Sequence, residues 1–268
     1  YDQAHARGYR DLTPNSPFVE DYAILQTSKE EGVLGPLRRG LTSAGLPVEF
    51  SKGEAGRGQH EINLTYQAAV EMADINAVFK NAVKEIAHQH GRSATFMAKP
   101  DFADAGSSCH IHSSLWTPAG EPLLPGDGPH HMSDTFRWYL GGLIATAREF
   151  SLLWAPTVNS YKRFQPGSWA PTGLGWDVDN RTLGFRVVGH GSGLRVENRI
   201  PGADTNSYLA FAATVAGGGA GGLFVPLVVQ GALTGRVLAG VFDAENQSLF
   251  VVLGIAAFLG LVEPPVLA

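Results

Sequence analysis

Apolar residues recur along the chain with a helical period in some segments and a strand period in others. Residues 68–90 hold the clearest helical pattern, which Gly91 ends, with apolar positions at Met72, Ile75, Phe79, Val83 and Ile86. Shorter patterns predict helices at 32–45 and 206–216 and a helix that Ser133 caps and that runs to 154. Further runs predict strands at 48–51, 60–65, 95–99, 110–116, 183–188 and 194–200. This mixed order favours an α+β fold over a doubly wound α/β fold.

The composition is typical of a folded soluble protein. The 268 residues suffice for one large domain or two small ones, with 44 % hydrophobic and 17 % charged residues. A net charge of −5 gives no reason to expect nucleic acid as the main partner. The single cysteine, Cys109, excludes an intrachain disulfide and suits a reducing cytosol. The first residues lack the apolar core of a signal peptide.

Two C-terminal stretches are uncharged, residues 205–235 and 249–262. Glycines and Pro226 break the first stretch, and the second has 14 residues, fewer than the ~20 that a membrane span needs. We therefore expect no membrane span, and read this part as buried core or as an apolar, Gly-rich tail.

Two carboxylates flank a Gly-rich turn in the segment 53–61. Glu54 precedes the turn and Glu61 lies on the strand that follows it. Such a turn can bring both side chains onto one hard cation, Mg²⁺ or Mn²⁺, which prefers oxygen ligands. The alternative is a pair of solvated loop glutamates.

A second group of polar side chains alternates along the predicted strand 110–116. On a strand, His110, His112, Ser114 and Trp116 would share one face. A neutral imidazole can join carboxylates on Mg²⁺ or Mn²⁺. Two histidines could also begin a zinc site, but the residues nearby do not complete one. A core histidine bonded to the main chain is the alternative.

Residues 159–199 concentrate positive charge in an acidic chain, at Lys162, Arg163, Arg181, Arg186, Arg195 and Arg199. On a strand, Arg195, Glu197 and Arg199 would share one face. Glu197 is either their salt-bridge partner or a metal ligand. Carboxylates, a histidine and arginines together fit phosphoryl transfer. The sequence has neither a P-loop nor a Gly-x-Gly-x-x-Gly that opens a helix.

Six motifs occur in the order found in one family. They are 58–61 (GQHE), 96–100 (FMAKP), 106–112 (GSSCHIH), 159–167 (NSYKRFQPG), 179–182 (DNRT) and 195–199 (RVENR). Over about residues 8–216 the chain resembles the catalytic domain of glutamine synthetases. The resemblance implies a curved, mainly antiparallel sheet with flanking helices in residues 1–218. Residues 219–268 depart from the family, and its N-terminal β-grasp domain and an upstream Glu-x-Glu pair of metal ligands are expected to be missing.

The resemblance also implies a mechanism in two steps. The γ-carboxylate of glutamate attacks ATP to give γ-glutamyl phosphate, and an amine then displaces phosphate. By this resemblance the metal ligands are Glu54 and Glu61 for one ion and His110 and Glu197 for the other. Glutamate contacts are Gly106, Arg163 and Arg199. ATP contacts are His112, Ser114, Arg186 and Arg195. Arg163 and Arg181 act on the transferring phosphoryl group.

The loop after Pro166-Gly167 departs from the ammonia-using members of the family. Trp169 stands where those members usually carry a Glu that binds and deprotonates ammonium. An indole accepts no proton, but its face attracts an alkylammonium by about 0.5–2 kcal/mol. This pattern resembles the branch that glutamylates polyamines or other organic amines. A packed aromatic without a substrate role is the alternative. Ala105 replaces an Asn that is common in the glutamate loop.

The sequence therefore predicts an ATP-dependent ligase that joins glutamate to an organic amine, a polyamine or ammonia. The resemblance implies a cytoplasmic homo-oligomer of two stacked hexameric rings, with no nucleic acid and no membrane as partner. The alternatives are a catalytically inactive relative with a structural or regulatory role, or an inactive fragment. A guanidino-phosphotransferase would share the chemistry but not the motifs.

Overall fold

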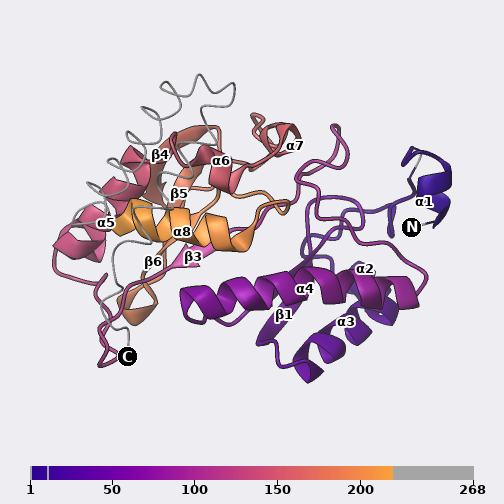
Figure 1. Cartoon of the computed structure of the whole chain (residues 1–268), viewed down its shortest axis with the longest axis horizontal. Coiled ribbons are helices and arrows are strands. Elements are labelled where there is room, and N and C mark those ends of the chain that lie inside the picture. Colours follow the sequence, from indigo (N-terminus) through magenta and orange to yellow (C-terminus); the bar gives the residue numbers. More distant parts are fainter. Residues whose placement is uncertain (1, 11, 220–268) are drawn as a thin grey trace, which may run out of the picture. The chain divides into compact units, whose positions relative to one another are not determined.

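The computed structural model describes residues 2–10 and 12–219 (Figure 1). The chain divides into two compact units and passes between them several times. The first unit holds Tyr1–His110, Leu152–Thr172 and Arg199–Phe211. The second unit holds Ile111–Ser151, Gly173–Asn198 and the chain from residue 212 on.

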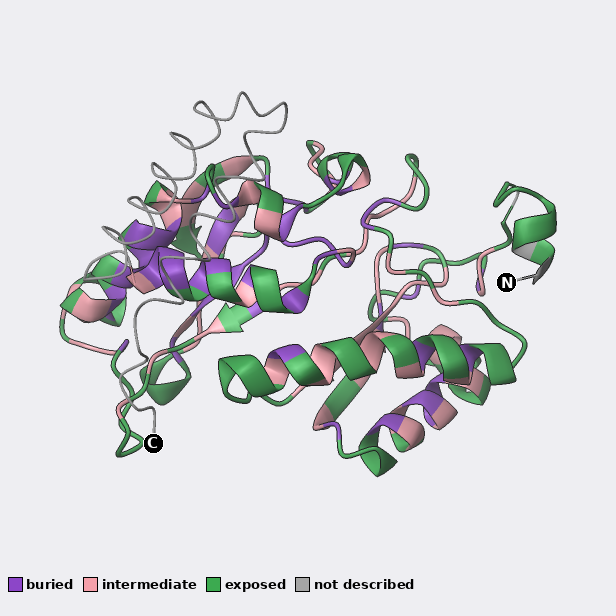
Figure 2. Cartoon of the chain, in the orientation of Figure 1, coloured by how far each residue is buried: buried purple, intermediate pink, exposed green. Residues whose placement is uncertain are grey.

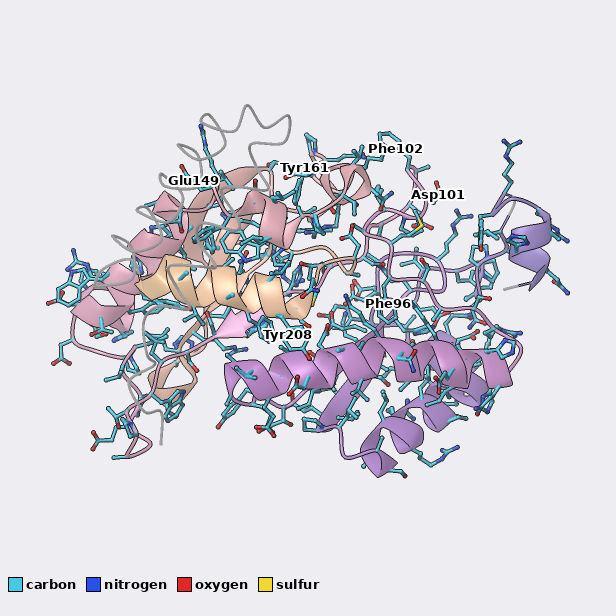
Figure 3. The ribbon with its side chains drawn as sticks, in the orientation of Figure 1. Phe96, Asp101, Phe102, Glu149, Tyr161 and Tyr208 are labelled. Carbon is cyan, nitrogen blue, oxygen red and sulfur yellow. The ribbon has the colours of Figure 1, made fainter. Side chains whose placement is uncertain are left out.

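The first unit is built on a pair of helices and a two-stranded hairpin. Its elements are α1 (Asp2–Ala6), α2 (Ile24–Ser28), α3 (Glu31–Ser43), β1 (Val48–Gly53), β2 (His60–Leu64), α4 (Ala69–Gln89) and α7 (Val158–Tyr161). Buried residues of α3 (Figure 2) form the core with Leu46 and with Val83 of α4. Phe96 packs edge-on against Phe79 of α4. Figure 3 shows Phe96 beside this helix. These elements confirm the predicted helices at 32–45 and 68–90 and the hairpin between them.

The second unit is built on a four-stranded sheet. Its elements are β3 (Ile111–Ser113), α5 (Asp134–Ala145), β4 (Gly173–Val178), β5 (Leu183–Val188), β6 (Arg195–Asn198) and two 3₁₀ turns at Pro129–His131 and Gly191–Gly193. The strand order is β3-β6-β5-β4. The pairs β3–β6 and β6–β5 are antiparallel, as predicted for most of the sheet, whereas β4 pairs with β5 in parallel. Two further helices, α6 (Ser151–Trp154) and α8 (Ser207–Gly218), cross from one unit to the other along the chain.

Helix α8 ends against helix α5 at a distance that excludes a side chain. A Cβ atom on Gly218 would lie 1.8 Å from the ring of Tyr139, and one on Gly217 would lie 2.7 Å from Oγ1 of Thr146. Glycine at both positions therefore permits the close approach of the two helices.

The predicted helix from 133 to 154 is wrong, because the chain forms α5 and α6 with a break between them. Ser133 caps α5 as expected, with its hydroxyl accepting from the Phe136 amide at 3.1 Å. At the other end the Thr146 hydroxyl donates to the Gly142 carbonyl, and the Ala147 amide bonds to Ile144, only three residues back. This tightening of the last turn ends the helix before α6 begins.

The predicted strand at 95–99 is also wrong. The main chain of Lys99 is bonded on both sides to the side-chain amide of Asn159, at 2.8 and 2.9 Å, and the Ala98 carbonyl accepts from the Ser107 amide. A side chain thus takes the place of a neighbouring strand. Strand β4 was not predicted, since its glycines are unusual in strands and only four residues connect it to β5.

In the part of the chain that the structure describes, no helix combines the length and the apolar character that crossing a membrane requires. The tail at 219–268 falls, apart from Gly219, outside the described residues. The division of the chain at residue 218 stays a prediction.

Tyr139 makes the second unit less stable at alkaline pH. Burial raises the pKa of this phenol from about 10 to about 12, although a 2.9 Å hydrogen bond to Ser113 of β3 opposes the shift. Above pH 10 the unfolded phenol ionises while the folded one does not, so the stabilisation is lost as the pH rises from about 10 to about 12. Urea titrations measure the free energy of unfolding at pH 9 and at pH 11.5. Between these pH values Tyr139 should cost the unaltered protein up to about 2 kcal/mol, and Tyr139→Phe should remove this part of the loss. The exposed Tyr66→Phe is the control, and an identical loss in both variants would exclude Tyr139 as the source.

Candidate functional site

The β1–β2 hairpin brings Glu54 and Glu61 together as the sequence predicted. Glu61 lies on β2 opposite Lys52, and the main chain of Glu54 bonds to Gln59 at 2.8 Å across the Gly-rich turn. Both side chains are half-buried. Burial raises the pKa of Glu61, and so does the nearby charged carboxyl of Glu54. A hydrogen bond from Asn63 opposes this shift. The alternative of two solvated loop glutamates is therefore wrong.

This pair of carboxylates has the chemistry of a divalent-cation site. Two adjacent carboxylates that disfavour each other's charge gain from a hard cation between them. At present Nζ of Lys52 supplies positive charge, at 2.7 Å from Glu54 and 2.9 Å from Asp21. Among the described residues no group of three or more His, Cys, Asp or Glu side chains is placed to hold a metal ion. The pair could thus supply two of a cation's ligands.

A second group in the first unit gathers Gly106, Arg163 and Arg199. Arg163 is 3 % exposed, and its Nη2 donates to the carbonyls of Arg199, Ile200 and Pro201 at 3.0, 2.5 and 3.1 Å. A Cβ on Gly106 would lie 2.6 Å from Cγ of Arg163, so the glycine makes room for the arginine. Burial and the charge of Arg199 lower the pKa of Arg163 to about 10. Two buried guanidinium groups side by side favour an anion as their ligand.

Trp169 is joined to this group through its main chain. Nη2 of Arg199 donates to the Trp169 carbonyl at 3.1 Å, while the indole itself is 64 % exposed. Its backbone is left-handed, with φ of 59°, which is costly for a bulky residue. The alternative of an indole packed in the core is wrong for this residue.

In the second unit Glu197 lies between two basic side chains of neighbouring strands. On β6 it stands opposite His112 of β3 and Arg186 of β5. Glu197 is 3 % exposed and its carboxylate lies 2.9 Å from Nη1 of Arg186 and 3.9 Å from Nε2 of His112. Burial opposes the charge of Arg186, but hydrogen bonds to Asp179 and Glu197 outweigh it and raise its pKa.

Arg195 orients the ring of His112 on the same face. Its Nε donates to Nδ1 of His112 at 2.9 Å. Because Nδ1 accepts this bond, a neutral His112 carries its proton on Nε2, the atom that faces Glu197. Glu197 thus forms an ion pair with Arg186 of β5, which the sequence had not singled out as its partner. Its role as a metal ligand stays a prediction.

Some predicted site residues lie on other elements than the sequence led us to expect. The expected common face of 110–116 is wrong, since β3 spans only Ile111–Ser113 and leaves His110 and Ser114 beyond its ends. The Ser114 hydroxyl accepts from Trp116 at 2.9 Å. Arg199 likewise follows β6 rather than sharing its face. Arg181 is exposed on the turn between β4 and β5.

Sequence reasoning missed the polar side chains that hold these groups in place. Oδ2 of Asp204 accepts from Thr157 and Ser160, at 2.7 and 2.6 Å, and so fixes the helix α7 that precedes Arg163. Arg57 forms ion pairs with Asp101 and Asp104. The partners are more than 40 residues apart in sequence, so local sequence patterns could not predict these contacts.

A family model described as "Glutamine synthetase, catalytic domain" matches residues 4–225. A second model, described as "Voltage gated chloride channel", matches residues 206–267, a minor part of the chain that lies mostly outside the described residues.

Curated relatives support the same family. Gamma-glutamylethanolamide synthetase GlnA4 of Streptomyces coelicolor is 50 % identical over 218 residues, which are 81 % of this chain and 46 % of the relative. Glutamate–isopropylamine ligase of a Pseudomonas species is 42 % identical over 78 % of this chain and 46 % of its own. The chain thus spans about half the length of these relatives. They confirm the predicted resemblance to glutamine synthetases and to their organic-amine branch.

A solved structure titled "GmaS/ADP complex-Conformation 1" matches with a TM-score of 0.69 and 31 % identity. The match covers 91 % of this chain and 59 % of the other. It confirms the predicted α+β fold of a glutamine synthetase-like catalytic domain.

Removing Glu197 should destabilise the second unit, because Arg186 is only 16 % exposed and would lose its buried partner. We expect Glu197→Gln to lower the free energy of unfolding by about 3 kcal/mol in urea titration. The control is Asp179→Asn, which removes the other partner of Arg186. Asp179 is 72 % exposed, so this change should cost less than about 1 kcal/mol. Equal costs in the two variants would contradict a structural role for the buried pair.

Proposed function

Because the chain belongs to the glutamine synthetase family by its catalytic domain, we propose that it is part of an ATP-dependent ligase. The enzyme joins the γ-carboxyl of glutamate to a small organic amine. A γ-carboxylate oxygen attacks the γ-phosphorus of ATP, and ADP leaves. The amine then attacks the carbonyl carbon of γ-glutamyl phosphate, and phosphate leaves with that oxygen. Relatives named for an ethanolamide and for isopropylamine support the choice of a small amine.

The glutamate site is the group around Arg163 in the first unit. Arg163 and Arg199 are both buried, and burial together with the nearby charge of Arg199 lowers the pKa of Arg163. Nε of Arg163 is buried and has no hydrogen-bond partner among the described residues. A carboxylate would supply the acceptor that this Nε lacks. Gly106 is the glutamate contact next to Arg163, whose stem fills the space that a side chain at position 106 would take.

The nucleotide site is the face of the second unit's sheet. Arg186 and Arg195 bind the phosphates of ATP, and His112 and Ser114 line its site. Arg181 stabilises the charge that develops on the transferred phosphoryl group. It is exposed on the turn between β4 and β5.

Enzymes of this family are ATP-dependent and use divalent metals. In this chain Glu54 and Glu61 would hold one ion, and His110 and Glu197 would hold a second. Mg²⁺ or Mn²⁺ there would neutralise phosphate charge. The carboxylate donors fit that chemistry, because burial and the proximity of Glu54 already raise the pKa of Glu61.

The observation that carries the choice of amine is the placement of Trp169. Its indole is exposed while its carbonyl is bonded to Arg199, a predicted glutamate contact. Its main chain is thus fixed to the group that we propose to hold the carboxylate to be activated. We assign the ring to the amine site on this basis. It offers an apolar surface and a cation–π face to an alkylammonium. Because an indole cannot take up a proton, another group or water must deprotonate the amine.

The family resemblance supports a cytoplasmic homo-oligomer of two stacked hexameric rings in which subunits share the active sites. The assembly takes its substrates, ATP and glutamate, from the cytoplasm.

Phosphate release tests the reaction. The protein, expressed from its complete coding sequence, is incubated with ATP, Mg²⁺ and glutamate across a panel that includes ammonia, ethanolamine, isopropylamine and putrescine. We expect release that depends on glutamate and is faster with the small organic amines than with ammonia. Release that no amine accelerates would instead favour an inactive relative.

Trp169→Glu should shift the preference towards ammonia. The loss of the indole face should lower kcat/KM for an alkylamine by about 2- to 30-fold, the equivalent of about 0.5–2 kcal/mol. Trp138→Glu is the matched control, since that indole in the second unit is equally exposed. An unchanged order of amines in the Trp169 variant would remove this residue from the amine site.

A further inference from the structure

The turn that carries Glu54 is bound to the loop that carries Gly106. Both belong to the first unit. The turn spans residues 53–59, and the loop spans residues 101–107, where Figure 3 shows Asp101 next to Phe102. Two side chains of the turn, those of Arg57 and Gln59, reach the loop.

Arg57 contacts the loop at three points. Its Nε donates to Oδ2 of Asp104 at 2.9 Å, its main-chain amide donates to the same oxygen at 3.3 Å, and its Nη2 donates to Asp101 at 3.2 Å. The other oxygen of Asp104 accepts from the Ala105 amide at 2.8 Å. A single guanidinium therefore fixes two carboxylates that themselves shape the loop around Ala105.

Gln59 makes the second connection with a side chain that is half-buried. Its Nε2 donates to the Gly106 carbonyl at 2.8 Å and to Oγ of Ser107 at 3.0 Å. Its Oε1 accepts from the Gly56 amide, and its main-chain carbonyl accepts from the Glu54 amide. The residue that holds Gly106 in place is thus bonded directly to Glu54.

We propose that Arg57 and Gln59 are positioning residues that couple cation binding at Glu54 and Glu61 to the order of the glutamate loop. The inference rests on the proposed function, in which this turn binds a cation and Gly106 contacts glutamate. A cation that fixes the Glu54 carboxylate restrains the turn, and the turn restrains the loop through both side chains. By linkage, glutamate bound at the loop then raises the affinity for the cation by the same factor by which the cation raises the affinity for glutamate.

The Arg57 ion pairs are exposed, and exposed ion pairs contribute little to overall stability. Their role is instead local, because three contacts from one residue leave the loop few other positions relative to the turn. Loss of the Arg57 contacts should therefore change the mobility of residues 101–107 rather than the free energy of unfolding of the unit.

Hydrogen–deuterium exchange of the chain, with and without manganese(II) chloride, tests the coupling without any need for turnover. The reporters are the amides of Ala103, Ala105 and Ser107, each of which donates a hydrogen bond within the loop or to Ala98. We expect Mn²⁺ to slow their exchange by about fivefold or more in the unaltered protein. Arg57→Gln should abolish the slowing while Mn²⁺ still binds, as followed by loss of the free-ion EPR signal.

Arg38→Gln is the matched control, since it removes an arginine that contacts Glu31 and Ser51 but not the loop, and it should keep the slowing. Asp104→Asn tests the same connection from the loop side and should behave as Arg57→Gln does. The coupling is overturned if Mn²⁺ binds without slowing the exchange of the loop amides. It is also overturned if Mn²⁺ slows that exchange in Arg57→Gln and Asp104→Asn as much as in the unaltered protein. Either result leaves the cation site standing. A chain that binds no Mn²⁺ overturns the cation site and the coupling together.

Discussion

The guanidinium of Arg163 is buried among main-chain carbonyls, and the surrounding loops are arranged to satisfy it. A buried cation is costly unless its N–H groups find acceptors, and here the carbonyls of residues 199–201 supply three. They hold the chain where it leaves β6 next to the end of α7. Gly106 cannot be larger because the stem of Arg163 passes beside it. The glutamate loop, residues 199–201 and the Trp169 loop are thus organised around one side chain.

The positive charge of residues 159–199 is divided between two environments. In the first unit Arg163 and Arg199 are buried next to each other, and no carboxylate lies against the unpaired Nε of Arg163 among the described residues. In the second unit Arg186 is balanced by Glu197 and Asp179. The first arrangement favours an incoming anion, whereas the second holds its charge in place until a ligand competes for it. This division fits the proposed binding of an anionic amino acid by the first unit and of a nucleotide by the second.

Local sequence patterns predicted the elements whose stability is local. The period of α4 and the hairpin around Glu54 and Glu61 belong to this class, as does β5. The expected strand at 95–99 failed because Asn159, 60 residues away, takes its hydrogen bonds. The residue types of the site were predictable from motifs, but not the burial of Arg163, since arginine is rarely buried. The pairing of Arg57 with Asp104 is equally non-local and left no trace in the pattern.

The central claim is that glutamate is activated by phosphorylation of its γ-carboxylate. The most direct measurement is the fate of oxygen in glutamate labelled with ¹⁸O in that group. The protein, expressed from its complete coding sequence, is given this substrate with ATP, Mg²⁺ and isopropylamine, and the released phosphate is analysed by mass spectrometry. The account predicts one ¹⁸O atom in each phosphate released with amide formation. Amide formation with unlabelled phosphate would contradict it.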